Sequence, residues 1–135
     1  MRMQEQPSRQ CRAVLLLETY VELLRVEYWL MVFGFSEVYR NVKNFPRSRK
    51  RSEVRSARDI CDLVDTACVL YFKQVRCLQR SVVMVRLLRG NGIPAELVIG
   101  VQHWPFRAHA WVESSGQIVG EKPYIAGMYD VVERC

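Results

Sequence analysis

The sequence of 135 residues lacks an apolar run long enough to cross a membrane. Its longest apolar stretch, residues 13 to 35, is interrupted by Glu18, Glu22, Arg25 and Glu27, whereas a membrane-spanning helix needs about 20 consecutive apolar residues. The start of the chain is polar and does not resemble a signal peptide. Internal repeats and low-complexity segments are also absent. These absences favour a cytoplasmic location.

The cysteines lack the close spacing that is typical of zinc ligands. There are five of them, at positions 11, 61, 68, 77 and 135, and their odd number argues against a set of disulfides. Cys61 and Cys68 are seven residues apart and would lie on one face of a helix, where we expect a structural role. We therefore predict no metal site, no disulfide framework and no cofactor.

Aromatic residues are missing from the most basic part of the chain, residues 47 to 51. The net charge of +6 is concentrated around this part, because seven basic residues and one acid lie between residues 43 and 58. Such a run can attract nucleic acid, but its most basic part, residues 47 to 51, contains no aromatic side chains on which bases would stack. We expect a solvated linker and no nucleic-acid partner.

Apolar residues at helical spacing fill most of the first two thirds of the chain. Gly34 and Pro46 suit the ends of the first two helices, and Ser36 suits the N-cap of the second. The predicted helices cover residues 12 to 33, 36 to 45, 53 to 72 and 77 to 89. The acids of the third helix, Asp59, Asp62 and Asp65, are expected to form a solvated stripe.

Alternating apolar residues replace the helical pattern after residue 92. Ser114-Ser115-Gly116 is typical of a hairpin turn, and the last stretch, residues 122 to 135, suits a further strand or a closing loop. Helices followed by strands indicate the α+β class with a small antiparallel sheet. The predicted strands cover residues 96 to 101, 106 to 113 and 117 to 121.

The length of the chain suits one compact domain. We expect residues 1 to 52 to form a helical lead-in and the basic linker, and residues 53 to 135 to form the core. The lead-in carries no constellation of catalytic side chains and is interpreted as a cover or docking layer.

Cys77 is the candidate nucleophile. It lies in the first turn of its predicted helix, where unpaired N–H groups and the positive end of the helix dipole favour a thiolate. Gln74, three residues earlier, is a candidate oxyanion donor. The alternative is a structural role for Cys77, since a lone cysteine on an apolar helix is usually a small buried hydrophobic residue.

His109 and Glu121 are the candidate base and its orienting acid. If the hairpin turns about Ser115, residues whose numbers sum to about 230 oppose each other, so His109 faces Glu121. Asp130 is the alternative carboxylate. The other histidine, His103, is expected in a surface or substrate-facing loop.

The order of a helix-borne cysteine, a histidine and an acid resembles the transglutaminase-like cysteine-protease superfamily. Within it, residues 77 to 121 are similar to the leader peptidases of lasso-peptide biosynthesis, on the segments CLQRS, LLR, GIPA, LVIGV and FRAHAWVE. The resemblance implies a transglutaminase/papain-like core in which Cys77 is the nucleophile and His109 the base. Glu121 stands where that family usually has aspartate.

The resemblance also implies a function, which is removal of the leader peptide from a ribosomally made precursor so that the core amine can close a macrolactam. This chain is similar to the stand-alone form. Its expected partners are the precursor, a separate leader-recognition protein and the ATP-dependent macrolactam synthetase. Arg80, Arg107 and Trp111 are expected to order the site or meet the peptide, although structural roles suit them as well.

Two other readings stay open at this point. The same triad could transfer the acyl group to an amine, as transglutaminases and acyltransferases do, and the mass of the product separates the two reactions. Alternatively, the chain is a non-catalytic adaptor in which the helix of residues 12 to 33 binds a peptide partner and Cys77 is incidental.

Overall fold

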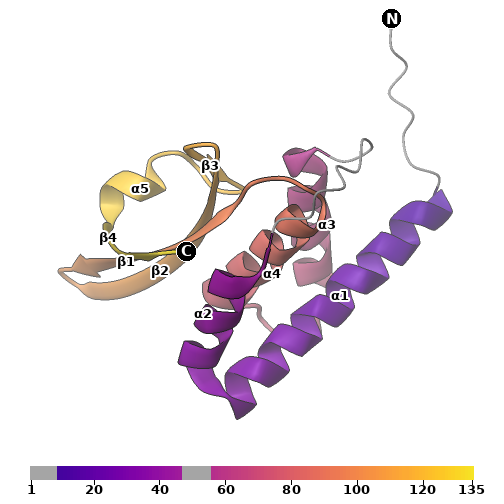
Figure 1. Ribbon diagram of the computed structural model, residues 1–135, viewed down its shortest axis with the longest axis horizontal. Coiled ribbons are helices and arrows are strands. Elements are labelled where there is room, and N and C mark those ends of the chain that lie inside the picture. Colours follow the sequence, from indigo (N-terminus) through magenta and orange to yellow (C-terminus); the bar gives the residue numbers. More distant parts are fainter. Residues whose placement is uncertain (1–8, 47–55) are drawn as a thin grey trace, which may run out of the picture.

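The computed structural model describes residues 9 to 46 and 56 to 135. Most of the basic run from 43 to 58 and the predicted start of the third helix at residue 53 lie outside this part. The chain forms a helical layer beside a curled sheet, which confirms the α+β class (Figure 1). The elements are α1 (Arg9–Val32), α2 (Gly34–Asn44), α3 (Ala57–Leu70), α4 (Cys77–Gly90), β1 (Glu96–His103), β2 (Phe106–Ser114), β3 (Gln117–Val119), α5 (Ile125–Met128) and β4 (Asp130–Arg134).

The join between α1 and α2 is tighter than the sequence pattern indicates. Helix α2 begins at Gly34 with Phe33 as its N-cap, and Ser36 lies inside the helix, so its predicted capping role is wrong. The chain turns sharply because Gly34 adopts a φ of 80°, which a glycine does without steric cost.

Helix α3 begins at Ala57 because a capping box precedes it. Ser56 Oγ accepts a hydrogen bond from the backbone N–H of Asp59 (3.3 Å), and the Asp59 carboxylate accepts one from the N–H of Ser56 (3.2 Å). These two bonds satisfy donors at the helix end that have no partner within the helix.

A hydrophobic core joins the helices to the sheet. Leu23 of α1, Val38 of α2, Val64 of α3, Val83 of α4 and Leu97 of β1 are all buried in it. Residues on both sides of the expected boundary at residue 52 therefore pack together. Helix α4 lies between α1 and the sheet (Figure 1).

The sheet is antiparallel with strand order β3-β2-β1-β4. Strands β1 and β2 form a long hairpin in which Gly100 is paired with His109. The last stretch of the chain, for which a strand or a loop was expected, supplies both α5 and the edge strand β4. Among the described residues, no helix is long and apolar enough to cross a membrane.

Candidate active site

Helix α4 begins at Cys77, as predicted. Arg76 has an extended backbone (ψ 154°), and its carbonyl accepts the first helical hydrogen bond from the N–H of Arg80 at 3.0 Å. No side chain caps this end of the helix within the part of the chain that the structure describes. The N–H groups of the first turn therefore point out of the helix end around a partly buried thiol.

His109 and Glu121 form a close pair. His109 Nε2 lies 3.0 Å and 2.9 Å from the two carboxylate oxygens of Glu121, and both side chains are about one fifth exposed. An ionised carboxylate only accepts hydrogen bonds, so Nε2 must carry the proton. In the neutral ring the lone pair is then on Nδ1, and Nδ1 is the nitrogen that can act as a base.

Glu121 reaches His109 by a different route from the one predicted. In the β2–β3 pair the opposed residues are Val112 with Val119 and Ser114 with Gln117, so the predicted register is off by one position. Strand β3 also ends at Val119, and Glu121 follows a turn at Gly120, whose φ is 76°. The turn, and not strand pairing, places the carboxylate on the imidazole.

Arg80 connects the first turn of α4 to this carboxylate. Its guanidinium donates to Asp65 of α3 (3.0 and 2.7 Å) and to the carbonyl of Gly120 (3.1 Å), and it lies 3.9 Å from Glu121. Asp65 is 53% exposed, as expected for a solvated stripe of acids, but it also holds Arg80, a contact that the sequence did not predict. The sequence offers no signal for this pair because its members come from different helices.

Ser81 fixes the position of α4 along β2. Its buried hydroxyl donates to the carbonyl of Ala110 at 3.0 Å, one residue after His109. Ser81 lies one helical turn after Cys77, so this bond holds the start of α4 beside the part of the strand that carries the histidine.

Two aromatic rings pack against His109. Trp111 is fully buried, with its ring centroid 6.1 Å from that of His109, and Tyr129 lies 5.4 Å from His109. Both rings are inclined to the imidazole by less than 30°. Trp111 is a predicted site residue, whereas Tyr129 is missed by the sequence patterns because it lies in the last stretch of the chain, where the strand pattern is weak.

Gly100 leaves the space that this aromatic cluster occupies. A Cβ at this position would lie 2.7 Å from Trp111 Cη2 and 2.8 Å from Tyr129 Cβ. We expect Gly100→Ala to lower the free energy of unfolding by about 1–3 kcal/mol, the usual cost of overpacking, as measured by urea denaturation. Gly90→Ala is the matched control, since a Cβ there meets nothing within 4 Å. Equal stability of the two variants would show that the aromatic cluster accommodates the added Cβ without loss in the free energy of unfolding.

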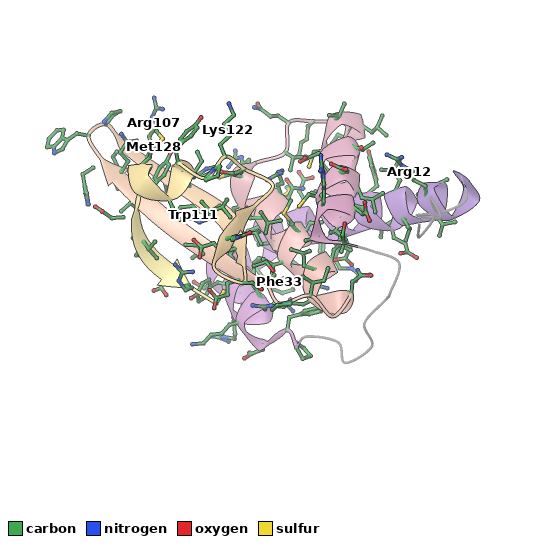
Figure 2. All side chains as sticks on the ribbon, turned by 90° about the horizontal axis from the view of Figure 1, so that it is seen from above. Arg12, Phe33, Arg107, Trp111, Lys122 and Met128 are labelled. Carbon is green, nitrogen blue, oxygen red and sulfur yellow. The ribbon has the colours of Figure 1, made fainter. Side chains whose placement is uncertain are left out.

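The remaining predicted residues lie apart from the pair. Asp130 is 80% exposed and lies 3.4 Å from His103, not beside His109. Gln74 is exposed in the connection before α4, and Arg107 is exposed at the outer end of the sheet, far from Arg12 of α1 (Figure 2). Within the described residues, no hydrogen bond joins Cys77 to His109.

Comparison with known proteins identifies a family and one distant relative. The model of the Transglutaminase-like superfamily matches residues 20–134. The microcin J25-processing protein McjB of Escherichia coli is 26% identical over 130 residues, which are 94% of this chain and 62% of McjB. The chain thus spans less than two thirds of that relative's length. No solved structure matches it.

The family match extends from α1 to the end of β4 and includes the helix that begins at Cys77 and the strand that carries His109. It covers Cys77, His109 and Glu121, and it agrees with the small antiparallel sheet beside the helix. The chain belongs to the transglutaminase-like superfamily.

Proposed function

We propose that this protein is a cysteine peptidase that cleaves the leader peptide from a lasso-peptide precursor in the cytoplasm. The observation that carries the proposal is the His109–Glu121 pair at 2.9 Å. Because Nε2 of His109 donates to the carboxylate, Nδ1 is left to accept a proton from a thiol. Arg80 ties this pair to the first turn of the helix that begins at Cys77. A nucleophile, a base and an orienting acid are the parts that acyl chemistry requires.

In the first half of the reaction, His109 Nδ1 takes the proton of Cys77, and the thiolate attacks the carbonyl carbon of the scissile bond. Charge develops on the carbonyl oxygen, and the uncapped N–H groups of the first turn of α4 are the donors that stabilise it. Collapse of this intermediate breaks the C–N bond. His109 gives its proton to the departing core amine, and the leader remains as a thioester.

In the second half, His109 takes a proton from water, and the resulting hydroxide attacks the thioester. The leader leaves with a free carboxylate, and the thiolate receives the proton back through the histidine. Glu121 keeps Nε2 protonated throughout and stabilises the imidazolium that forms in each half.

The substrate class is supported by the similarity to a microcin-processing protein and by the resemblance of residues 77 to 121 to the lasso leader peptidases. We propose the precursor's leader as the bound substrate, with a separate leader-recognition protein that presents it. The macrolactam synthetase is the proposed partner that takes up the freed core amine.

Mass spectrometry of a precursor peptide incubated with this protein and its recognition protein tests the proposed reaction. In water enriched with oxygen-18, hydrolysis gives a leader whose new carboxylate carries one heavy oxygen, and a core with a free amine. An unlabelled amide adduct of the leader would establish acyl transfer to an amine instead. An intact precursor, with the recognition protein shown to bind it, would contradict both reactions.

Selective alkylation is expected to identify Cys77 as the reactive thiol. Burial raises the pKa of Cys61 to about 11 and also raises the pKa values of Cys68 and Cys135. These three are therefore thiols at pH 7 and react slowly. Iodoacetamide at pH 7, followed by peptide mapping, should label Cys77 before these three, and turnover should fall in proportion to the label on Cys77. Earlier labelling of Cys61 would contradict the assignment.

Arg80→Lys is expected to lower kcat/KM roughly tenfold, which corresponds to about 1.4 kcal/mol. Lysine keeps the charge, but it cannot donate two bonds to Asp65 and a third to Gly120 in one plane. The loss should fall on kcat, since no substrate contact is removed. Arg40→Lys, at an exposed ion pair with Glu37, is the matched control. Equal activity of both variants would exclude a positioning role for Arg80.

A further inference from the structure

Helix α1 is apolar on two sides. Its inner side is buried in the core through Leu23 and Val26. Its other side carries six apolar residues that are each between 41% and 77% exposed. A contiguous exposed apolar patch of this kind usually marks an interaction surface, so this surface calls for a partner. We call it the outer seam, and it consists of Val14, Leu17, Val21, Leu24, Tyr28 and Met31.

The spacing of the outer seam indicates what covers it. Its residues follow one another at intervals of three, four, three, four and three. This is the a and d pattern of a heptad repeat, which keeps a straight apolar stripe in contact with one other helix. The seam runs along most of the 24 residues of α1. The partner surface is therefore a helix that lies along α1.

We propose that the outer seam pairs with the outer seam of a second copy of this chain, with the two α1 helices antiparallel. In that arrangement each a position faces a d position, and a two-fold axis makes every contact occur twice. All facing pairs have residue numbers that sum to 45, so the whole seam is used. The pairs are Val14 with Met31, Leu17 with Tyr28, and Val21 with Leu24.

The charges beside the seam favour this pairing. Glu18 and Arg25 are the charged residues at the e positions of the two central heptads, and both are exposed. In the antiparallel pair, Glu18 of one copy lies beside Arg25 of the other, twice per dimer. In a parallel pair in register they would remain one heptad, about 10 Å, apart along the axis. Arg25 already donates to Glu22 of its own helix at 2.9 Å, so the contact would place a second carboxylate on its guanidinium.

A groove next to the seam has room for a side chain of the second copy. It has a volume of about 410 Å³ and lies between α1 and α4, with Leu17, Val21, Phe45 and Leu87 among its lining residues. Tyr28 of the second copy faces Leu17 in the proposed pairing, which brings an exposed ring to this groove.

The pairing leaves the candidate active site open. Helix α1 lies on the side of the helical layer away from the sheet, and α4 separates the two (Figure 1). The sheet that carries His109 would thus lie at each end of the dimer, away from the seam. The inference does not depend on the proposed reaction, and its test does not use activity.

Sedimentation equilibrium of the full chain tests the dimer, over concentrations from about 1 to 100 µM, where a weak interface is partly dissociated. The native chain is expected to be a dimer that dissociates on dilution. Leu24→Glu places one glutamate from each copy in the centre of the interface. It should raise the dissociation constant of the dimer roughly a hundredfold or more. Val69→Glu, at an 83% exposed position on α3, is the matched control and should dimerise normally. A native chain that is monomeric throughout would overturn the proposal.

Charge reversal tests the partner and the direction of pairing. Glu18→Arg and Arg25→Glu should each weaken the dimer roughly tenfold, because each places like charges together at two symmetric positions. The double variant restores opposite charges and should dimerise within about twofold of the native chain. Dimerisation without this rescue would exclude the antiparallel seam. Circular dichroism of every variant should show an unchanged helix content, since the substituted positions are exposed.

Discussion

Cys77→Ala is expected to reduce leader cleavage by at least about a thousandfold, to the rate that binding and oxyanion stabilisation alone provide. The substitution removes one sulfur atom from a partly buried position at the start of α4. The uncapped N–H groups and the His109–Glu121 pair remain in place. The loss should therefore appear in kcat, while precursor binding changes little. Single-turnover cleavage followed by mass spectrometry measures it.

The matched control for this variant is Cys68→Ala. Cys68 is also partly buried and free, but it lies in α3 and burial raises the pKa of its thiol. Its replacement should leave the cleavage rate within about twofold of the native rate. If both variants cleaved the leader at the native rate, Cys77 would not be the nucleophile.

A double variant distinguishes a nucleophile from a residue that only shapes the site. When two residues act in one proton transfer, removing the second costs little after the first is gone. Cys77→Ala combined with His109→Ala should therefore be no slower than Cys77→Ala alone. Additive losses would indicate that the two residues act independently, and the proposed proton transfer would then be wrong.

Local sequence patterns are sufficient for the elements that carry the site. The start of α4 at Cys77 follows from apolar spacing over the next three turns, and the strand that carries His109 follows from its own residue pattern. Both signals arise within a few residues of chain. For this reason the helix of the proposed nucleophile and the strand of the histidine are predictable from the amino-acid sequence alone.

The position of Glu121, the third member of the proposed site, could not be derived from local sequence patterns. The sequence places Glu121 near His109, but through a strand register that the structure does not have. The turn at Gly120 ends β3 and redirects the chain, and the Gly120 carbonyl is then held by Arg80. Arg80 is in turn held by Asp65 of α3. Contacts among three separate elements leave no periodic signal, so they are visible only in the folded chain.

Glu121→Gln is expected to lower kcat/KM by about a hundredfold or more. The amide keeps the shape of the side chain but carries no negative charge to stabilise the imidazolium. Its NH2 group can also face Nε2, which then acts as an acceptor and shifts the proton to Nδ1. The ring would thus present a proton, and not a lone pair, toward the thiol. The measurement is kcat/KM against pH for both proteins.

Two further variants test whether Glu121, and not Asp130, orients His109. Asp130→Asn should leave kcat/KM unchanged, because Asp130 lies beside the exposed His103. Glu121→Asp keeps the charge but is one methylene shorter, and it should retain more activity than Glu121→Gln if charge matters more than reach. A large loss in Asp130→Asn together with a small one in Glu121→Gln would transfer the orienting role to Asp130. The geometry argues for the opposite result, because both carboxylate oxygens of Glu121 lie within 3.0 Å of Nε2.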